Sequence, residues 1–112
     1  MEKEINQRLI LQMEMLKSYE IHGGDPANYK ETLTNLRDAI VLSISKEKDS
    51  IVVGRLVSAL VTVIDAINLI DGIRMGKDSD ELIREGKFIQ MLASNLLGKN
   101  AMIIFDVTIK QN

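Results

Sequence analysis

The residue types that most often perform catalysis are scarce in this chain of 112 residues. It has one histidine, His22, and no cysteine, which excludes disulfides, cysteine nucleophiles and thiolate zinc sites. Two glycines follow His22, as in the oxyanion loop of some esterases, but the sequence lacks the G-x-S-x-G elbow that carries the serine of those enzymes. We therefore expect an exposed histidine, no metal, no cofactor and no enzymatic activity.

Residues 72–78 superficially resemble a phosphate-binding loop. That motif has four residues between its glycines and a serine or threonine after the lysine. Here three residues separate Gly72 from Gly76, and Asp78 follows Lys77. A helix end followed by a new helix start, with Asp78 and Glu81 as a capping box, explains the segment better.

Four basic residues surround this break and are the candidates for contacts to a nucleotide or a phosphate backbone: Arg74, Lys77, Arg84 and Lys87. Acidic residues are interleaved with them, and the net charge of the whole chain is −2. Such a mixed field attracts nucleic acid weakly. We expect a solvated surface here, with phosphate binding as the alternative.

Asp65 is the carboxylate whose surroundings matter most, because it lies on the most apolar segment of the chain. A buried carboxylate needs a cationic or hydrogen-bonding partner. Arg55 is ten residues away, about 15 Å along a helix, so it cannot reach Asp65 in the same chain. An antiparallel second copy of this segment would bring the two together, and we predict both at an oligomer interface. The alternative is that Asp65 simply faces solvent.

The spacing of apolar residues predicts four helices, over residues 3–20, 26–46, 51–75 and 79–97. The clearest boundary is at Gly23 and Gly24, which suit a helix end, followed by Asp25 as an N-cap and Pro26 as the first helical residue. In the fourth helix, Gly86 weakens the helix but allows a neighbouring backbone to approach, and Gly98 is the predicted stop.

Residues 39–53 allow a second interpretation. Apolar and other residues alternate from Ala39 to Ser45, and residues 46–50 are polar, so a β-hairpin competes with a helix, a turn and a further helix. The longer helical spacing on both sides favours the helices.

Residues 51–75 are the most apolar part of the chain. Their polar residues recur at steps of three and four, which indicates a helix rather than a strand: Arg55, Ser58, Thr62, Asp65 and Asn68. A helix that is apolar around most of its circumference lies at the centre of a bundle or in an oligomer core. We do not expect a membrane span, because such a helix needs about 20 apolar residues and Asp65 would lie near its middle.

At the end of the chain, apolar residues recur at every second position instead of every third or fourth. Ile103, Phe105, Val107 and Ile109 alternate with other residues, which predicts a half-buried β-strand over residues 102–110. A strand without a partner in its own chain exposes backbone donors and acceptors to another chain. We therefore predict that two copies pair through these strands, with their apolar face against the helices.

Composition agrees with one small globular domain. Apolar residues make up 46% of the chain and charged residues 27%, both ordinary values. Aromatic residues make up 4%, without tryptophan, which disfavours base stacking. The charged first residues do not form a signal peptide, and we expect a cytoplasmic protein.

The sequence thus predicts a mainly α fold, a four-helix bundle-like domain over residues 1–112 with one C-terminal strand that pairs between subunits. We expect a non-enzymatic homo-oligomer, a dimer in the first place, that acts as an adaptor, inhibitor, small chaperone or assembly component. One alternative is a protein that binds a small ligand or nucleotide in a pocket at the subunit interface. The other is a nucleic-acid-binding protein.

Overall fold

The computed structural model describes the backbone of residues 2–71 and 79–99, and the side chains of residues 7–71 and 86–99. Within these ranges the chain forms four helices, α1 (Glu2–His22), α2 (Pro26–Lys46), α3 (Ser50–Asp71) and α4 (Ser79–Lys99). The prediction of a mainly helical chain with four helices is confirmed. The predicted strand over residues 102–110 lies outside the described residues.

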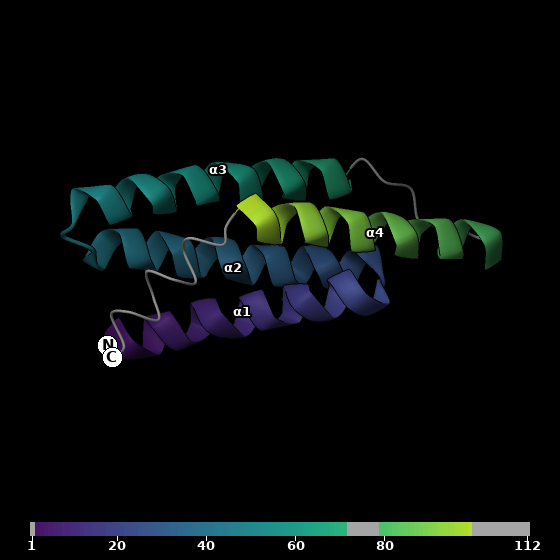
Figure 1. The fold of residues 1–112 in the computed structure, drawn as a ribbon, viewed down its shortest axis with the longest axis horizontal. Coiled ribbons are helices and arrows are strands. Elements are labelled where there is room, and N and C mark those ends of the chain that lie inside the picture. Colours follow the sequence, from purple (N-terminus) through teal and green to yellow (C-terminus); the bar gives the residue numbers. More distant parts are fainter. Residues whose placement is uncertain (1, 72–78, 100–112) are drawn as a thin grey trace.

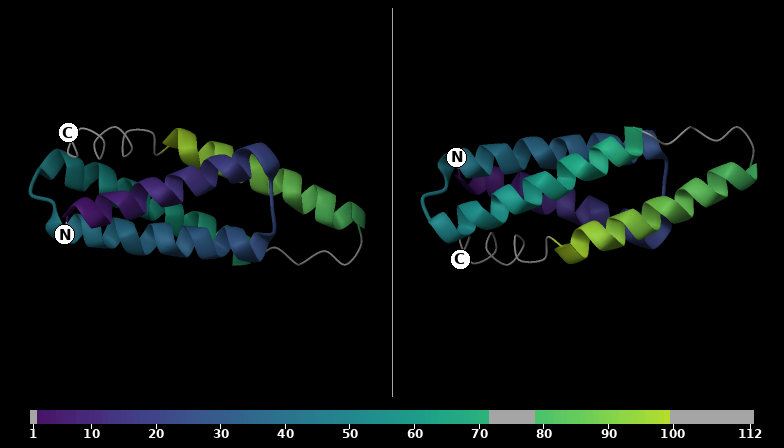
Figure 2. Two further views of the ribbon diagram at one scale, coloured as in Figure 1. Left: turned by 90° about the horizontal axis from the view of Figure 1, so that it is seen from below. Right: turned by 90° about the horizontal axis from the view of Figure 1, so that it is seen from above.

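The four helices lie side by side, with α3 along the upper edge and α1 along the lower edge of the view (Figure 1). α1 packs along both α2 and α4, and α2 also packs along α3, whereas α3 and α4 meet over a shorter stretch. One end of α4 projects past the ends of the other helices in all three views (Figures 1 and 2). The bundle is therefore closed least tightly between α3 and α4.

The core is built from the inward-facing apolar residues that the helical period selects. Each helix contributes to one continuous cluster in which side chains are almost fully buried, as in the interior of a close-packed domain. Its members include Leu9, Met13, Leu16, Tyr29, Leu33, Leu36, Ile40, Leu56, Val63, Ile67, Ile89, Ala93 and Leu96.

The turn between α1 and α2 follows the predicted chemistry. Gly23 has a φ of 70°, the left-handed conformation that glycine adopts without a steric penalty, and its N–H donates to the carbonyl of Tyr19 at 2.7 Å. Asp25 then caps α2, because its Oδ2 accepts from the backbone N–H of Asn28 at 3.3 Å. Pro26 is the first residue of α2, where its missing N–H has no consequence.

Residues 39–53 are helix, turn and helix, so the hairpin alternative is wrong. Two acidic side chains explain the outcome. Glu47 Oε1 accepts from the N–H groups of Lys48 and Asp49, both at 3.0 Å. Asp49 Oδ1 accepts from the N–H of Ile51 at 2.9 Å and of Val52 at 3.5 Å, which satisfies donors at the start of α3 that have no intrahelical partner.

Two details of α4 differ from the prediction. The helix continues through Gly98 to Lys99, so the predicted stop at Gly98 is wrong; helix ends commonly shift by one or two residues. The backbone of Gly86 lies close to Gly23, but the missing side chain that allows this approach is that of Gly23. A Cβ at Gly86 would meet nothing within 4 Å, whereas a Cβ at Gly23 would lie 2.5 Å from the carbonyl oxygen of Gly86.

Candidate interaction surface

The outward side of α3 carries a line of exposed apolar side chains. Val57, Val61 and Ile64 are 44%, 53% and 40% exposed. Their spacing of four and three residues places them along one side of a helix. We call these three residues the α3 stripe. Large apolar side chains that share one face in this way are typical of a surface that contacts another molecule.

The opposite side of α3 is part of the core. Leu56, Ala59, Val63, Ile67 and Ile70 are buried there, so α3 is apolar on both its inner and its outer side. Among the described residues, α3 is the one helix long and apolar enough to cross a membrane, criteria that a core helix of a soluble protein also meets. Only 22% of its most apolar window is buried, so this apolar helix keeps a solvent-exposed side.

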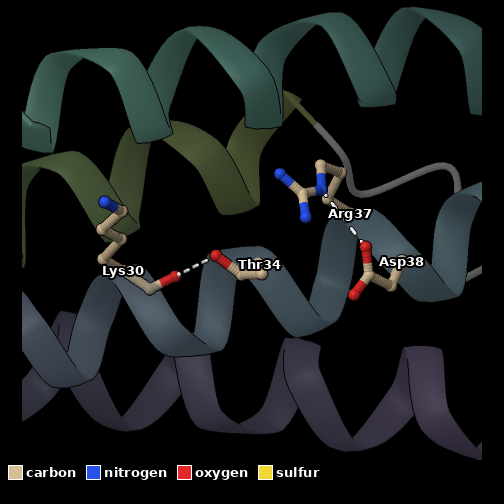
Figure 3. Close-up of polar contacts among 4 residues, drawn as sticks. All are labelled: Lys30, Thr34, Arg37 and Asp38. Carbon is tan, nitrogen blue, oxygen red and sulfur yellow. Dashed lines mark hydrogen bonds and ion pairs between the residues drawn. The ribbon is translucent and has the colours of Figure 1, made fainter.

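One ion pair crosses the border between α2 and α3. Lys30 near the start of α2 pairs with Asp71 at the end of α3, as the antiparallel arrangement of these two helices allows. On the neighbouring turns of α2, the Thr34 hydroxyl donates to the Lys30 carbonyl at 3.0 Å, and Arg37 pairs with Asp38 at 3.2 Å (Figure 3).

The neighbouring helix α2 carries a further exposed apolar residue. Val41 is 48% exposed. Counting from the Lys30–Asp71 pair, it comes level with the turn of α3 that contains Val57 and Leu60. Val41 is therefore at the same height along the bundle as the α3 stripe.

The two charged residues predicted at an interface lie on the same helix but apart. Asp65 is exposed and sits beside the α3 stripe, while Arg55 is half-buried and already has an interaction of its own. About 15 Å of helix separates them. The structure does not bring them together within one chain, and their role at an interface stays a prediction.

A shallow hollow of about 150 Å³ opens where α3 and α4 diverge. Asp65 and Lys99 lie on its lining with the polar Thr62 and Asn95, and apolar walls come from both helices. Pockets for small ligands usually have volumes of about 300–1,000 Å³. This hollow is too small for most ligands, but it places a carboxylate and an ammonium group at the open edge between α3 and α4.

A second hollow of about 320 Å³ lies between α1 and α2, lined by Arg8, Gln12, Asn35, Asp38 and others. Gln12 is 8% exposed, and its Oε1 is buried with no hydrogen-bond partner among the described residues. An unpaired buried carbonyl is costly. Gln12 was not among the predicted site residues, although its position on the inward side of α1 with Leu9 and Leu16 is visible in the sequence.

Tyr29 is the most perturbed titratable group in the described part of the chain. Its side chain is fully buried, and its ring meets that of Tyr19 edge-on at a centroid distance of 5.2 Å. Burial, and secondarily the neighbouring Tyr19, raises the pKa of the Tyr29 phenol well above its ordinary value of 10.0. Its hydroxyl has no partner among the described residues.

Most of the remaining predicted site residues lie outside the described side chains. Arg74 and Lys77, like Ile103, Phe105, Val107 and Ile109, lie outside the described residues, and Arg84 is described only as backbone of α4. Lys87 is exposed on α4, and His22 is exposed at the end of α1. Phosphate contacts by these basic residues therefore stay a prediction.

The described ranges contain no candidate metal site. No group of three or more histidine, cysteine, aspartate or glutamate side chains is placed there to hold a metal ion. Comparisons with protein-family models, with curated proteins and with solved structures found no significant match. The uncovered side of α3 is the feature that calls for an explanation.

Proposed function

We propose that this chain is a non-enzymatic, homo-oligomeric interaction protein that associates through the exposed apolar side of α3. The observation that carries the proposal is the α3 stripe, Val57, Val61 and Ile64, on a helix whose other side already belongs to the core. A monomer in water gains nothing from these side chains, whereas a second apolar surface would remove them from solvent.

The energetics favour a dimer that uses more than the stripe alone. A fully buried valine or isoleucine contributes about 1.5–3 kcal/mol. A dimer would bury six stripe side chains. Because each is only about half exposed in the single chain, each would contribute about half of this value, and their burial would favour the dimer by roughly 5–9 kcal/mol in total. The loss of translational and rotational freedom costs about 4–15 kcal/mol. The stripe therefore supports association but needs additional contacts.

The predicted C-terminal strand is the proposed source of those contacts. Ile103, Phe105, Val107 and Ile109 would add four apolar side chains per copy, and strand pairing across a two-fold axis would add backbone hydrogen bonds. In this proposal the chain acts as a dimeric adaptor, inhibitor, small chaperone or assembly component.

The test is the mass of the purified chain in its native state, over a range of concentrations and in protein taken from its own host. We expect a dimer whose fraction grows with concentration. A monomer at every concentration, with nothing bound, would remove the proposal.

Small-ligand binding is the second candidate, and the hollow between α1 and α2 is the observation that favours it. Its volume of about 320 Å³ falls at the lower end of the usual range for ligand pockets, and Gln12, whose buried Oε1 has no hydrogen-bond partner among the described residues, lies on its lining. Co-purification of a small molecule that Gln12→Leu abolishes would favour this candidate. A chain whose native mass contains no added molecule would argue against it.

A further inference from the structure

The exposed side of α3 is arranged so that it complements itself when one copy is reversed. We infer that the partner on this surface is a second copy of the chain, with the two α3 helices packed antiparallel about a two-fold axis that passes beside Val61. This inference rests on the proposed function and specifies its geometry.

The apolar residues of the α3 stripe match in the reversed orientation. Val57 and Ile64 are equally far from a point between Leu60 and Val61, and successive residues turn by about 100° around a helix. Val57 and Ile64 therefore both lie on the same side of a line drawn through Val61 parallel to the helix axis. A two-fold axis across the helices returns each residue to that side in the partner, so Val57 meets the partner's Ile64 and Val61 lies next to its own symmetry copy.

The charged residues match the same register to within one residue. Arg55 and Asp65 are equally far from Leu60, half a residue from the centre of the Val57–Ile64 pair, so Asp65 comes within about 1.5 Å along the axis of the partner's Arg55. Asp65 leaves the helix about 40° from Val61 and Arg55 about 120°, so the long Arg55 side chain must reach round its own helix to meet the partner's Asp65. Arg55 has an interaction in its own chain, but a guanidinium has five N–H donors and can bind a second acceptor. A parallel pairing in register would instead bring the two Asp65 carboxylates together, which is unfavourable.

Gly54 gives an independent reason for a close helix on this surface. It lies inside α3 and is exposed, and a Cβ built on it would meet nothing within 4 Å. Glycine weakens a helix interior, and nothing in the described part of the chain uses its missing side chain. In the antiparallel pair Gly54 lies within one residue of the height of the partner's Asn68, where the small residue lets the two backbones approach.

The absence of cysteine from the sequence makes the geometry directly testable by single-cysteine variants. Under mild oxidation we expect Val61→Cys to form a disulfide-linked dimer, because the two Cβ atoms lie close to the axis and disulfides require Cα atoms within about 7 Å. A mixture of Val57→Cys and Ile64→Cys should give the mixed dimer in preference to either symmetric one. Leu11→Cys, an equally exposed apolar position on α1, should not cross-link.

The outcomes separate the geometry from the proposed function. Symmetric dimers of Val57→Cys and of Ile64→Cys, without the mixed species, would show a parallel pair and overturn the inference. A wild-type dimer whose Val61→Cys variant cross-links no better than Leu11→Cys would also overturn it, while leaving association itself intact. A wild-type chain that is monomeric at all concentrations would remove both.

Discussion

The turn between α1 and α2 requires glycine at position 23, whereas α4 does not require glycine at position 86, which faces it. An alanine at position 23 would have a φ of 70° and a Cβ 2.5 Å from the Gly86 carbonyl oxygen. We expect Gly23→Ala to lower the free energy of unfolding by about 2 kcal/mol. Gly86→Ala should raise it by about 0.5–1 kcal/mol, since alanine is the better helix former and its Cβ meets open space. Urea unfolding of both variants checks the pair; equal effects would contradict this account of the turn.

The buried phenol of Tyr29 links stability to pH. Because burial raises the pKa of Tyr29 above its ordinary value of 10.0, the folded state holds this proton more tightly than the unfolded state. The corresponding stability is fully present below about pH 10 and is lost as the pH rises beyond it. We expect Tyr29→Phe to reduce this alkaline loss and to leave stability at pH 7 unchanged or raised, since it removes an unpaired hydroxyl.

The control for this prediction is Tyr19→Phe, which keeps both rings and the Tyr29 hydroxyl and should keep most of the alkaline loss, because burial is the larger cause of the raised Tyr29 pKa. Urea unfolding at pH 7 and at several values above pH 9 measures the difference. If the free energy of unfolding falls as steeply above pH 9 in Tyr29→Phe as in the wild type, the Tyr29 phenol is not the cause of the alkaline loss.

At the scale of the elements, the side chain of Asp49 caps the start of α3. Asp49 accepts hydrogen bonds from the N–H groups of Ile51 and Val52. We expect Asp49→Ala to lower the free energy of unfolding by about 1 kcal/mol, and Asp49→Asn to change it little, because asparagine caps helices as well as aspartate does. Equal losses in the two variants, measured by chemical unfolding, would mean that capping is not the reason.

The number of helices and their inward sides were predictable because a 3.6-residue period is readable over 20 residues. The hairpin alternative arose because Ala39–Ser45 fits both periods; the capping by Glu47 and Asp49, which decides between them, depends on side-chain contacts that spacing does not reveal. The unpaired Oε1 of Gln12 was unpredictable for a related reason. Periodicity shows that a residue faces inward, but not whether its polar atoms find partners there.

At the scale of the whole molecule, the proposed dimer should depend on the end of the chain as well as on α3. Deleting residues 102–112 removes the apolar residues of the predicted strand. We expect the truncated chain to be monomeric at concentrations where the full chain is dimeric, as measured by sedimentation. An unchanged dissociation constant would exclude the strand from the interface and leave α3 as its main part.

The most direct test of association through α3 compares two matched substitutions. Val61 and Leu11 are exposed to a similar degree, 53% and 56%, on different helices. In sedimentation equilibrium we expect a dimer for the wild type and for Leu11→Asp, but a monomer for Val61→Asp, because a carboxylate on the two-fold axis would face its own copy. Circular dichroism should show the same helix content in all three chains. A folded Val61→Asp variant that dimerises as tightly as the wild type would contradict the account.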